Sequence, residues 1–223
     1  MCNAYARLRA LLTRWKLSVD RRNDEGLSTG TFPDQPAAVI RRLPDGGLEA
    51  LNMRWGFPPK EGAGAPVTNA RHLDSDFWRP WLQPENRCLV PATSFCEPTD
   101  TRPNVWHWFA LDETRPLFAF AGLWRPWTGA RGPKKAPIVG DHLLFTILTT
   151  YANADVKPVH GRAMPVILRS EEECARWLAA PAGEALKMQR PLPSGVLKVV
   201  ARGPKEDEVE VAAELSDGLL PHP

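Results

Sequence analysis

The 223-residue sequence has no long hydrophobic run, few cysteines and little net charge. No apolar stretch approaches the roughly 20 residues that a membrane-spanning helix needs, and the first residues lack the charged-then-apolar pattern of a signal peptide. The four cysteines are widely separated, and a chain of this length does not need disulfides for stability. These absences argue against a membrane-spanning or disulfide-rich secreted protein, so we expect a soluble, cytoplasmic one.

The formal net charge of +2 does not by itself indicate a nucleic-acid partner. The charge is unevenly distributed, because residues 102–169 hold nine Lys and Arg against four Asp and Glu, whereas residues 170–223 hold six against ten. Tyr occurs twice and Trp nine times, so the tryptophans either fill a core or stack on unpaired bases. We expect one domain over residues 2–204 and an acidic, flexible tail over 205–223.

Short apolar runs separated by Pro and Gly indicate many strands and few helices. The predicted strands lie at 37–43, 48–57, 87–90, 105–111, 117–124, 143–149, 164–168 and 197–201. A basic amphipathic helix is expected at 4–16, a short helix at 73–83, and another beginning at the capping box 170–173. Segments 21–36 and 128–141 are predicted to be loops. The pattern predicts a β-rich α+β domain.

Cys2 is the most informative residue, because removal of Met1 leaves its thiol beside a free α-amine. Such a 1,2-aminothiol condenses with an aldehyde through an imine, which the thiolate closes into a five-membered thiazolidine. An α-amine has an ordinary pKa of about 7.7 to 8.0, so part of it is a neutral nucleophile at physiological pH. Taken alone, Cys2 is also consistent with an ordinary residue in a frayed terminus.

Three further residues have side chains suited to acid–base or phosphate chemistry. His160 lies in a loop between two predicted strands, and histidine as a residue type exchanges protons near neutral pH. Arg162 follows in the same loop and suits a phosphate. Glu97 directly follows an apolar run, where partial burial would raise its pKa and suit it to acid or base work. Each is alternatively a solvated surface residue.

Asn69 and Arg71 follow a loop rich in Pro and Gly, and they offer amide and guanidinium hydrogen bonds. Turn chemistry is the alternative explanation for the Asn. Trp55, which precedes a Gly-Phe-Pro-Pro turn, is the tryptophan that we expect on the surface, where an indole ring stacks on an unpaired base.

Together these motifs resemble the SOS response-associated peptidase (SRAP) family, whose domain forms DNA–protein crosslinks at abasic sites. The matching segments, in family order, are residues 1–3, 53–57, 69–71, 87–92, 95–97, 120–124, 145–150, 152–153 and 160–168. Each segment alone is weak, but the ordered set spans residues 2 to about 203 and is highly specific. Two departures are Asn3-Ala4, where the family often has Gly-Arg, and Pro98, where Trp is common.

The resemblance implies four catalytic residues. Cys2 would attack the aldehyde of the ring-opened abasic sugar and form the thiazolidine, and Asn69 would help to position that linkage. Glu97 would lie beside the amino terminus and take part in removing the initiator Met. His160 would act as general acid and base for sugar-ring opening and for the Schiff-base chemistry.

The resemblance also implies a DNA-binding surface and a fold. Arg71 and Arg162 would hold the phosphates that flank the lesion, and Trp55 would contact nearby bases. The implied fold is a single α+β domain with an antiparallel, barrel-like β core flanked by short helices. The implied partner is single-stranded DNA that contains abasic sites, bound by a monomer without a membrane, metal or cofactor.

The sequence leaves other functions open. The first is a DNA-repair protein that crosslinks abasic sites through Cys2, with weak lyase activity through the imine. A second is a cysteine-dependent peptidase, which self-removal of Met1 would already satisfy, and a third is a non-covalent binder of single-stranded DNA. A zinc site at Cys88, Cys96 and His107 is a fourth, although their spacing matches no common ligand pattern.

Overall fold

The computed structural model describes residues 2–3, 31–59, 64–133 and 135–203. The helix predicted at 4–16, most of the loop predicted at 21–36 and the tail predicted at 205–223 lie outside the described residues. No helix among the described residues is long and apolar enough to cross a membrane.

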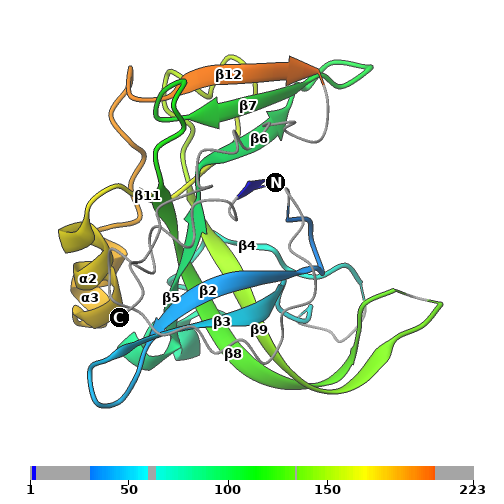
Figure 1. Ribbon diagram of the computed structural model, residues 1–223, viewed down its shortest axis with the longest axis vertical. Coiled ribbons are helices and arrows are strands. Elements are labelled where there is room, and N and C mark those ends of the chain that lie inside the picture. Colours follow the sequence, from blue (N-terminus) through cyan, green and yellow to red (C-terminus); the bar gives the residue numbers. More distant parts are fainter. Residues whose placement is uncertain (1, 4–30, 60–63, 134, 204–223) are drawn as a thin grey trace, which may run out of the picture.

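The centre of the molecule is a closed five-stranded β-barrel (Figure 1). Its strands are β2 (Pro36–Arg42), β3 (Leu48–Trp55), β5 (Arg87–Ala92), β8 (Phe118–Arg131) and β9 (Ile138–Thr150). They pair in the order β9–β3–β2–β5–β8, and β8 pairs again with β9 to close the barrel. The predicted α+β fold with a barrel-like core is confirmed. Its neighbours are antiparallel except β3 and β9, which are parallel.

Shorter elements surround the barrel. They are β4 (Asn69–Ala70), the 3-10 turns η1 (Arg79–Trp81) and η2 (Pro84–Asn86), β10 (Met164–Pro165), β11 (Ile167–Leu168), α2 (Glu171–Ala179) and α3 (Ala182–Leu186). The start of α2 follows the predicted capping box, because Ser170 Oγ accepts a hydrogen bond of 3.1 Å from the Glu173 amide. The helix predicted at 73–83 is wrong, since that segment forms turns and the single 3-10 turn η1.

A second, smaller sheet lies above the barrel in Figure 1. It consists of β1 (Cys2–Asn3), β6 (Ser94–Pro98), β7 (Trp106–Ala110) and β12 (Lys198–Gly203), paired in that order. All three pairings are antiparallel. The sheet therefore brings the start of the chain and the last described strand to its opposite edges.

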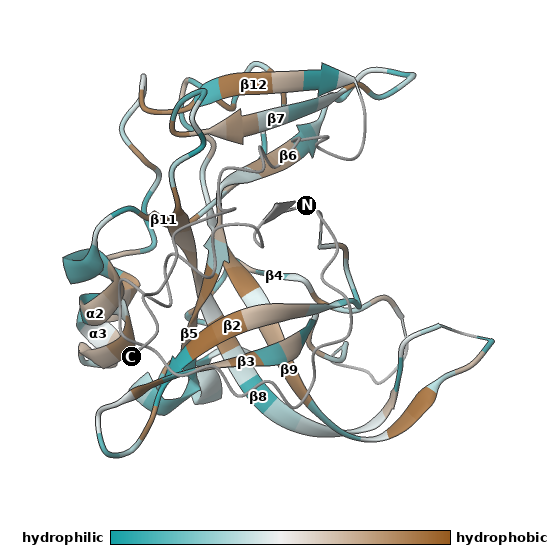
Figure 2. Ribbon diagram, viewed as in Figure 1, coloured by the Kyte–Doolittle hydropathy of each residue, from teal (hydrophilic) through white to brown (hydrophobic). Residues whose placement is uncertain are grey.

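Both faces of β2 and β5 are largely buried, as are the first half of β8 and the second half of β9, which explains the apolar runs in these segments (Figure 2). On β2, Val39 packs in one hydrophobic cluster and Ile40 in another, because successive side chains of a strand point to opposite faces. The cluster of Ile40 includes Trp177 of α2, whereas that of Val39 includes Phe109 of the small sheet. The barrel wall thus separates two cores, one under the helices and one under the small sheet.

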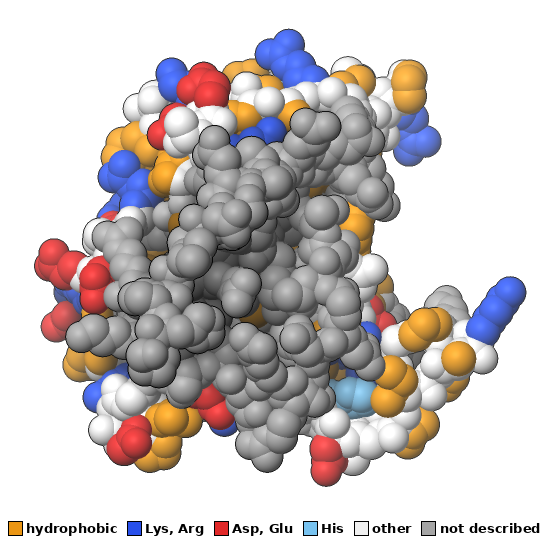
Figure 3. Space-filling view, viewed as in Figure 1, with side chains coloured by type: hydrophobic (Ala, Val, Ile, Leu, Met, Phe, Trp, Pro, Cys, Tyr) orange, Lys and Arg blue, Asp and Glu red, His pale blue; other side chains and the backbone are white. Residues whose placement is uncertain are grey.

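The loop predicted at 128–141 is wrong, because β8 and β9 continue through most of it as a hairpin. Its arms do not need an apolar period, since cross-strand contacts hold them: Thr128 Oγ1 donates a 2.6 Å hydrogen bond to Asp141. Where β8 ends, beside the turn, buried Arg131 forms a 2.6 Å ion pair with Asp34. Towards the turn, Val139 is 76% exposed, and hydrophobic side chains gather on this hairpin in Figure 3.

Candidate functional site

The start of the chain is held against β6 by the pairing of β1. Cys2 is opposite Phe95 and Asn3 is opposite Ser94 in an antiparallel register. From this register, the direction towards the amino terminus runs along β6 towards Glu97, which is two residues beyond Phe95. Backbone pairing therefore sets the amino terminus next to a carboxylate.

Glu97 and His160 form the centre of the candidate site. His160 Nε2 lies 4.0 Å from Glu97 Oε2, and their side chains are only 21% and 23% exposed. Burial raises the pKa of Glu97, and the positive charges of His160 and of the amino terminus oppose that rise. A carboxyl group with a raised pKa beside an imidazole is suited to taking up and releasing protons.

A second carboxylate lies on the other side of the imidazole. Asp100 Oδ1 is 4.0 Å from His160 Nδ1, and the Asp100 side chain is 60% exposed. The Nδ1 atom is itself buried and has no hydrogen-bond partner among the described residues. His160 is thus flanked by one largely buried and one exposed carboxylate, and its Nδ1 atom lacks a hydrogen-bond partner among the described residues.

The loop that carries His160 is a tight turn organised by Asn153. The Asn153 Oδ1 atom accepts hydrogen bonds of 3.2 Å from the Asp155 amide and 3.1 Å from the Val156 amide, as a helix cap does. Its amide nitrogen donates to the Leu192 carbonyl at 3.2 Å, and the His160 amide closes the turn on the Val156 carbonyl at 2.9 Å. Asn153 therefore fixes the position from which His160 projects.

The two predicted phosphate-binding arginines lie together. Arg71 Nη1 donates a 2.9 Å hydrogen bond to the carbonyl oxygen of Arg162, which is two residues beyond His160. The side-chain nitrogen of Gln189 donates hydrogen bonds to the Arg71 carbonyl at 2.6 Å and to the Thr149 carbonyl at 2.9 Å. Gln189 thereby ties the segment of Arg71 to the end of β9. Asn69 lies on β4, and its side chain is exposed.

The expected surface position of Trp55 is wrong. Its side chain is only 6% exposed, its ring stacks on Phe145 at 6.1 Å between centroids, and its indole nitrogen donates to the Thr68 carbonyl at 3.0 Å. The Trp-Gly turn is drawn inwards because the Gly56 amide bonds to the Phe145 carbonyl at 2.7 Å. Trp55 is packed in the barrel wall, where β3 pairs with β9.

Four residues of this region were given no role from the sequence: Asp100, Tyr151, Asn153 and Gln189. Asn153 occurs in a family-like segment, but its capping role follows only from the turn that it organises. Gln189 contacts Arg71 across 118 positions, so no local pattern predicts it. Tyr151 could have been identified from the sequence, since it is one of only two tyrosines and directly follows an apolar strand.

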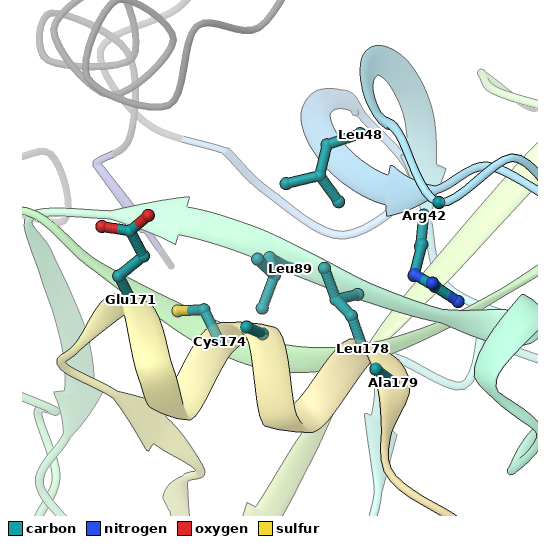
Figure 4. A pocket seen from close by; sticks show the side chains of 9 residues that line it. Arg42, Leu48, Leu89, Glu171, Cys174, Leu178 and Ala179 are labelled. Carbon is teal, nitrogen blue, oxygen red and sulfur yellow. The ribbon is translucent and has the colours of Figure 1, made fainter.

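A cleft elsewhere on the barrel shows no comparable chemistry. It lies between α2, which supplies Glu171 and Cys174, and the β2–β3 hairpin, which supplies Arg42 and Leu48 (Figure 4). Burial, reinforced by two neighbouring glutamates, raises the pKa of Cys174 to about 12, so its thiol is not a ready nucleophile.

Cys88, Cys96 and the possible metal ligands of the described chain show no arrangement suited to catalysis. Burial raises the pKa of the Cys88 thiol, and Cys96 is buried in β6. In the part of the chain that the structure describes, no three His, Cys, Asp or Glu side chains are grouped as metal ligands would be. Cys88, Cys96 and His107 thus form no such group.

The fold and the site define a class of protein: a small β-barrel domain whose amino-terminal strand pairs with the strand that carries the glutamate of a Glu–His pair, near two arginines. Residues 1–202 match the family model of the SOS response associated peptidase (SRAP). The chain belongs to this family.

Known relatives and structures are consistent with that membership. Over 151 residues the chain is 33% identical to the abasic site processing protein YoaM of Bacillus subtilis (63% of this chain, 61% of that protein). It is 32% identical to YoqW, also called an abasic site processing protein, over 63% of this chain and 62% of that protein. The matches thus span about three-fifths of these relatives.

Solved structures share the fold at lower identity. A crystal structure of a Bordetella bronchiseptica protein superimposes with a TM-score of 0.69 at 21% identity, covering 91% of this chain and 97% of that one. A Bacteroides thetaiotaomicron protein gives 0.64 at 20% identity, covering 88% of both chains.

Proposed function

We propose that this protein processes abasic sites in single-stranded DNA by forming a covalent thiazolidine crosslink through Cys2 after removal of Met1. The observation that carries the proposal is the β1–β6 register, which pairs Cys2 with Phe95, two residues from the Glu97 of the Glu97–His160 pair. The relatives called abasic site processing proteins support the same substrate. The crosslink would shield the abasic site from strand scission.

The proposed reaction needs no oxidant, reductant or metal. The abasic sugar opens from its cyclic hemiacetal to the aldehyde, and the Cys2 α-amine adds to the aldehyde carbon. Loss of one water gives an imine, the thiolate then adds to the imine carbon, and the nitrogen takes up a proton. His160 supplies and removes the protons for ring opening and dehydration, and Asn69 holds the linkage by hydrogen bonding. Elimination of the 3′ phosphate from the imine would give weak lyase activity.

The arginines supply the binding energy for the strand in this proposal. Arg71 and Arg162 are cationic, adjacent and next to the His160 turn, so they suit the phosphates that flank the lesion. A phosphate contact fixes register without reading bases, which suits a protein that recognises a missing base. Because Trp55 is buried, we do not assign it a stacking role.

Denaturing electrophoresis tests the crosslink. Protein confirmed by mass spectrometry to lack Met1 is mixed with a single-stranded oligonucleotide that carries one abasic site, and the mixture is boiled. We expect a heat-stable shifted band from wild type, none from Cys2→Ala, and slow formation by His160→Ala. The intact oligonucleotide serves as the control. Absence of a band from Met1-free wild type contradicts the proposal.

Removal of Met1 by the protein itself is a second candidate activity, favoured by the raised pKa of Glu97 beside the amino terminus. Glu97 would act as the base that takes a proton from the water molecule attacking the Met1–Cys2 peptide bond. We expect Glu97→Gln to retain Met1 in protein made in vitro without aminopeptidase, where wild type loses it. The intact masses of the two proteins decide the point, and equal loss of Met1 would assign the step to another enzyme.

A further inference from the structure

Tyr151 presents an exposed aromatic ring at the edge of the candidate site. Its side chain is 74% exposed, although most large hydrophobic side chains of the described chain are buried. The Arg71 guanidinium lies over the ring, with its central carbon 5.4 Å from the ring centroid. The ring therefore has a cation on one side and is otherwise largely open to solvent.

This arrangement is fixed by contacts on both partners. Arg71 is held by its hydrogen bond to the Arg162 carbonyl, and Gln189 ties the backbone of Arg71 to that of Thr149, two residues before Tyr151. Thr150 pairs with Met164, so Tyr151 and the segment of Arg162 leave the same end of the barrel. The ring and the guanidinium are thus presented as one unit beside the His160 turn.

We propose that Tyr151 is a stacking platform for an unpaired base next to the abasic site, while Arg71 holds the adjoining phosphate. An aromatic ring accepts any base, because every base has a π face, and a nearby cation attracts the backbone. The inference rests on the proposed function, since it assigns a contact to the same single strand. It makes Tyr151 a determinant of DNA affinity rather than a catalytic residue.

Equilibrium binding of an intact single-stranded oligonucleotide, measured by fluorescence anisotropy at several salt concentrations, separates the two contacts. We expect Tyr151→Leu, which keeps apolar bulk over Arg71, to weaken binding about 5- to 30-fold with no change in salt dependence. Arg71→Gln should reduce the slope of log affinity against log salt by about 0.7, the loss of one phosphate contact.

Two matched variants control this measurement. Tyr151→Phe retains the ring and should bind within about twofold of wild type if stacking is the contact. Val139→Ala removes a side chain that is equally exposed, at 76%, but lies on the β8–β9 hairpin, and it should bind as wild type does.

A fluorescent base reports the stacking directly. With 2-aminopurine placed next to the abasic site, wild type and Tyr151→Phe should quench its emission on binding, whereas Tyr151→Leu should not. Equal affinity and quenching in Tyr151→Leu would overturn the inference while leaving the Cys2 crosslink intact. A reduced salt slope in Tyr151→Leu would also overturn it, because the ring would then act only by holding Arg71. If Tyr151→Leu weakens binding but wild type forms no crosslink, stacking stands and the proposed function fails.

Discussion

At the scale of single residues, His160 is placed between two carboxylates that differ in their surroundings. Glu97 is three-quarters buried on β6, whereas Asp100 is 60% exposed in the loop that follows. The imidazole therefore has a carboxylate near each ring nitrogen, one largely buried and one exposed. A separation of 4.0 Å is too long for a hydrogen bond, so neither carboxylate is hydrogen-bonded to the imidazole in this structure.

We predict that Asp100 positions His160 for the reaction. Asp100→Asn removes the negative charge that faces Nδ1, and the rate of crosslink formation should fall about three- to tenfold, a fraction of what general acid–base catalysis contributes. The measurement is a quenched time course of crosslinking at saturating DNA. DNA affinity should be unchanged, because the variant removes no cation, and an unchanged rate would show that Asp100 has no positioning role.

A second residue-scale prediction concerns stability and pH at Glu97. Burial raises the pKa of Glu97, so the folded protein keeps a proton that the unfolded chain releases earlier as the pH rises. The proton on Glu97 stabilises the folded protein fully below the unfolded-state pKa of about 4.3. This stabilisation is lost as the pH rises through the higher pKa of Glu97 in the folded state. The Gln side chain of the Glu97→Gln variant cannot ionise. The melting temperature of the variant, relative to that of wild type, should therefore be higher at pH 8 than at pH 4.

Thermal unfolding followed by circular dichroism at both pH values tests this prediction. Glu113→Gln, at an exposed loop position, is the matched control and should track wild type at both values. A Glu97→Gln melting temperature that differs from wild type by the same amount at pH 4 and pH 8 would contradict it.

At the scale of elements, one buried cation joins β5 to the end of α2. Arg87 is fully buried and donates to the carbonyls of Leu82 at 2.7 and 2.9 Å, Trp177 at 2.9 Å and Ala180 at 2.6 Å. Burial lowers the pKa of Arg87 to about 10. Since the last carbonyls of a helix lack partners within it, Arg87 acts as their cap.

We predict that Arg87→Met lowers the free energy of unfolding by about 3 kcal/mol or more, because several buried carbonyls lose their donor. Urea unfolding measures the loss. Arg79→Met is the control, because the contacts of Arg79 are exposed: a 2.9 Å hydrogen bond to the Asp74 carbonyl and a 3.2 Å ion pair with Asp76, the latter worth under about 1 kcal/mol. Equal losses in the two variants would mean that the carbonyls of α2 find other partners.

Most strands were predictable, because a buried strand carries its own apolar and β-branched signal. The predicted runs 37–43 and 48–57 correspond closely to β2 and β3. The hairpin arms of β8 and β9 were missed because they are held by cross-strand pairs such as Trp127 with His142, not by burial. Of the site, individual residue types were predictable, but the Arg71–Arg162 and Arg71–Gln189 contacts depend on the barrel's closure.

At the scale of the whole molecule, the small sheet connects both ends of the described chain to the site. β12 pairs with β7 from Lys198 opposite Ala110 to Gly203 opposite Trp106, β7 pairs with β6, and β6 carries Glu97 and pairs with β1. We therefore expect the position of the amino terminus beside Glu97 to depend on the edge strand β12, although β12 contributes no side chain to the Glu97–His160 pair.

This dependence predicts different outcomes for two truncations. A chain ended after residue 204 removes only the predicted tail and should retain its melting temperature and its crosslinking. A chain ended after Leu197 removes β12 and exposes the edge of β7, so its melting temperature should fall by roughly 5 °C or more and crosslinking should slow. The chain ended after residue 204 is the control for the chain ended after Leu197, and thermal unfolding together with the abasic-site gel measures both. If ending the chain after residue 204 is equally destabilising, residues 205–223 belong to the folded domain; if ending it after Leu197 changes neither property, β6 holds the amino terminus without support from β12.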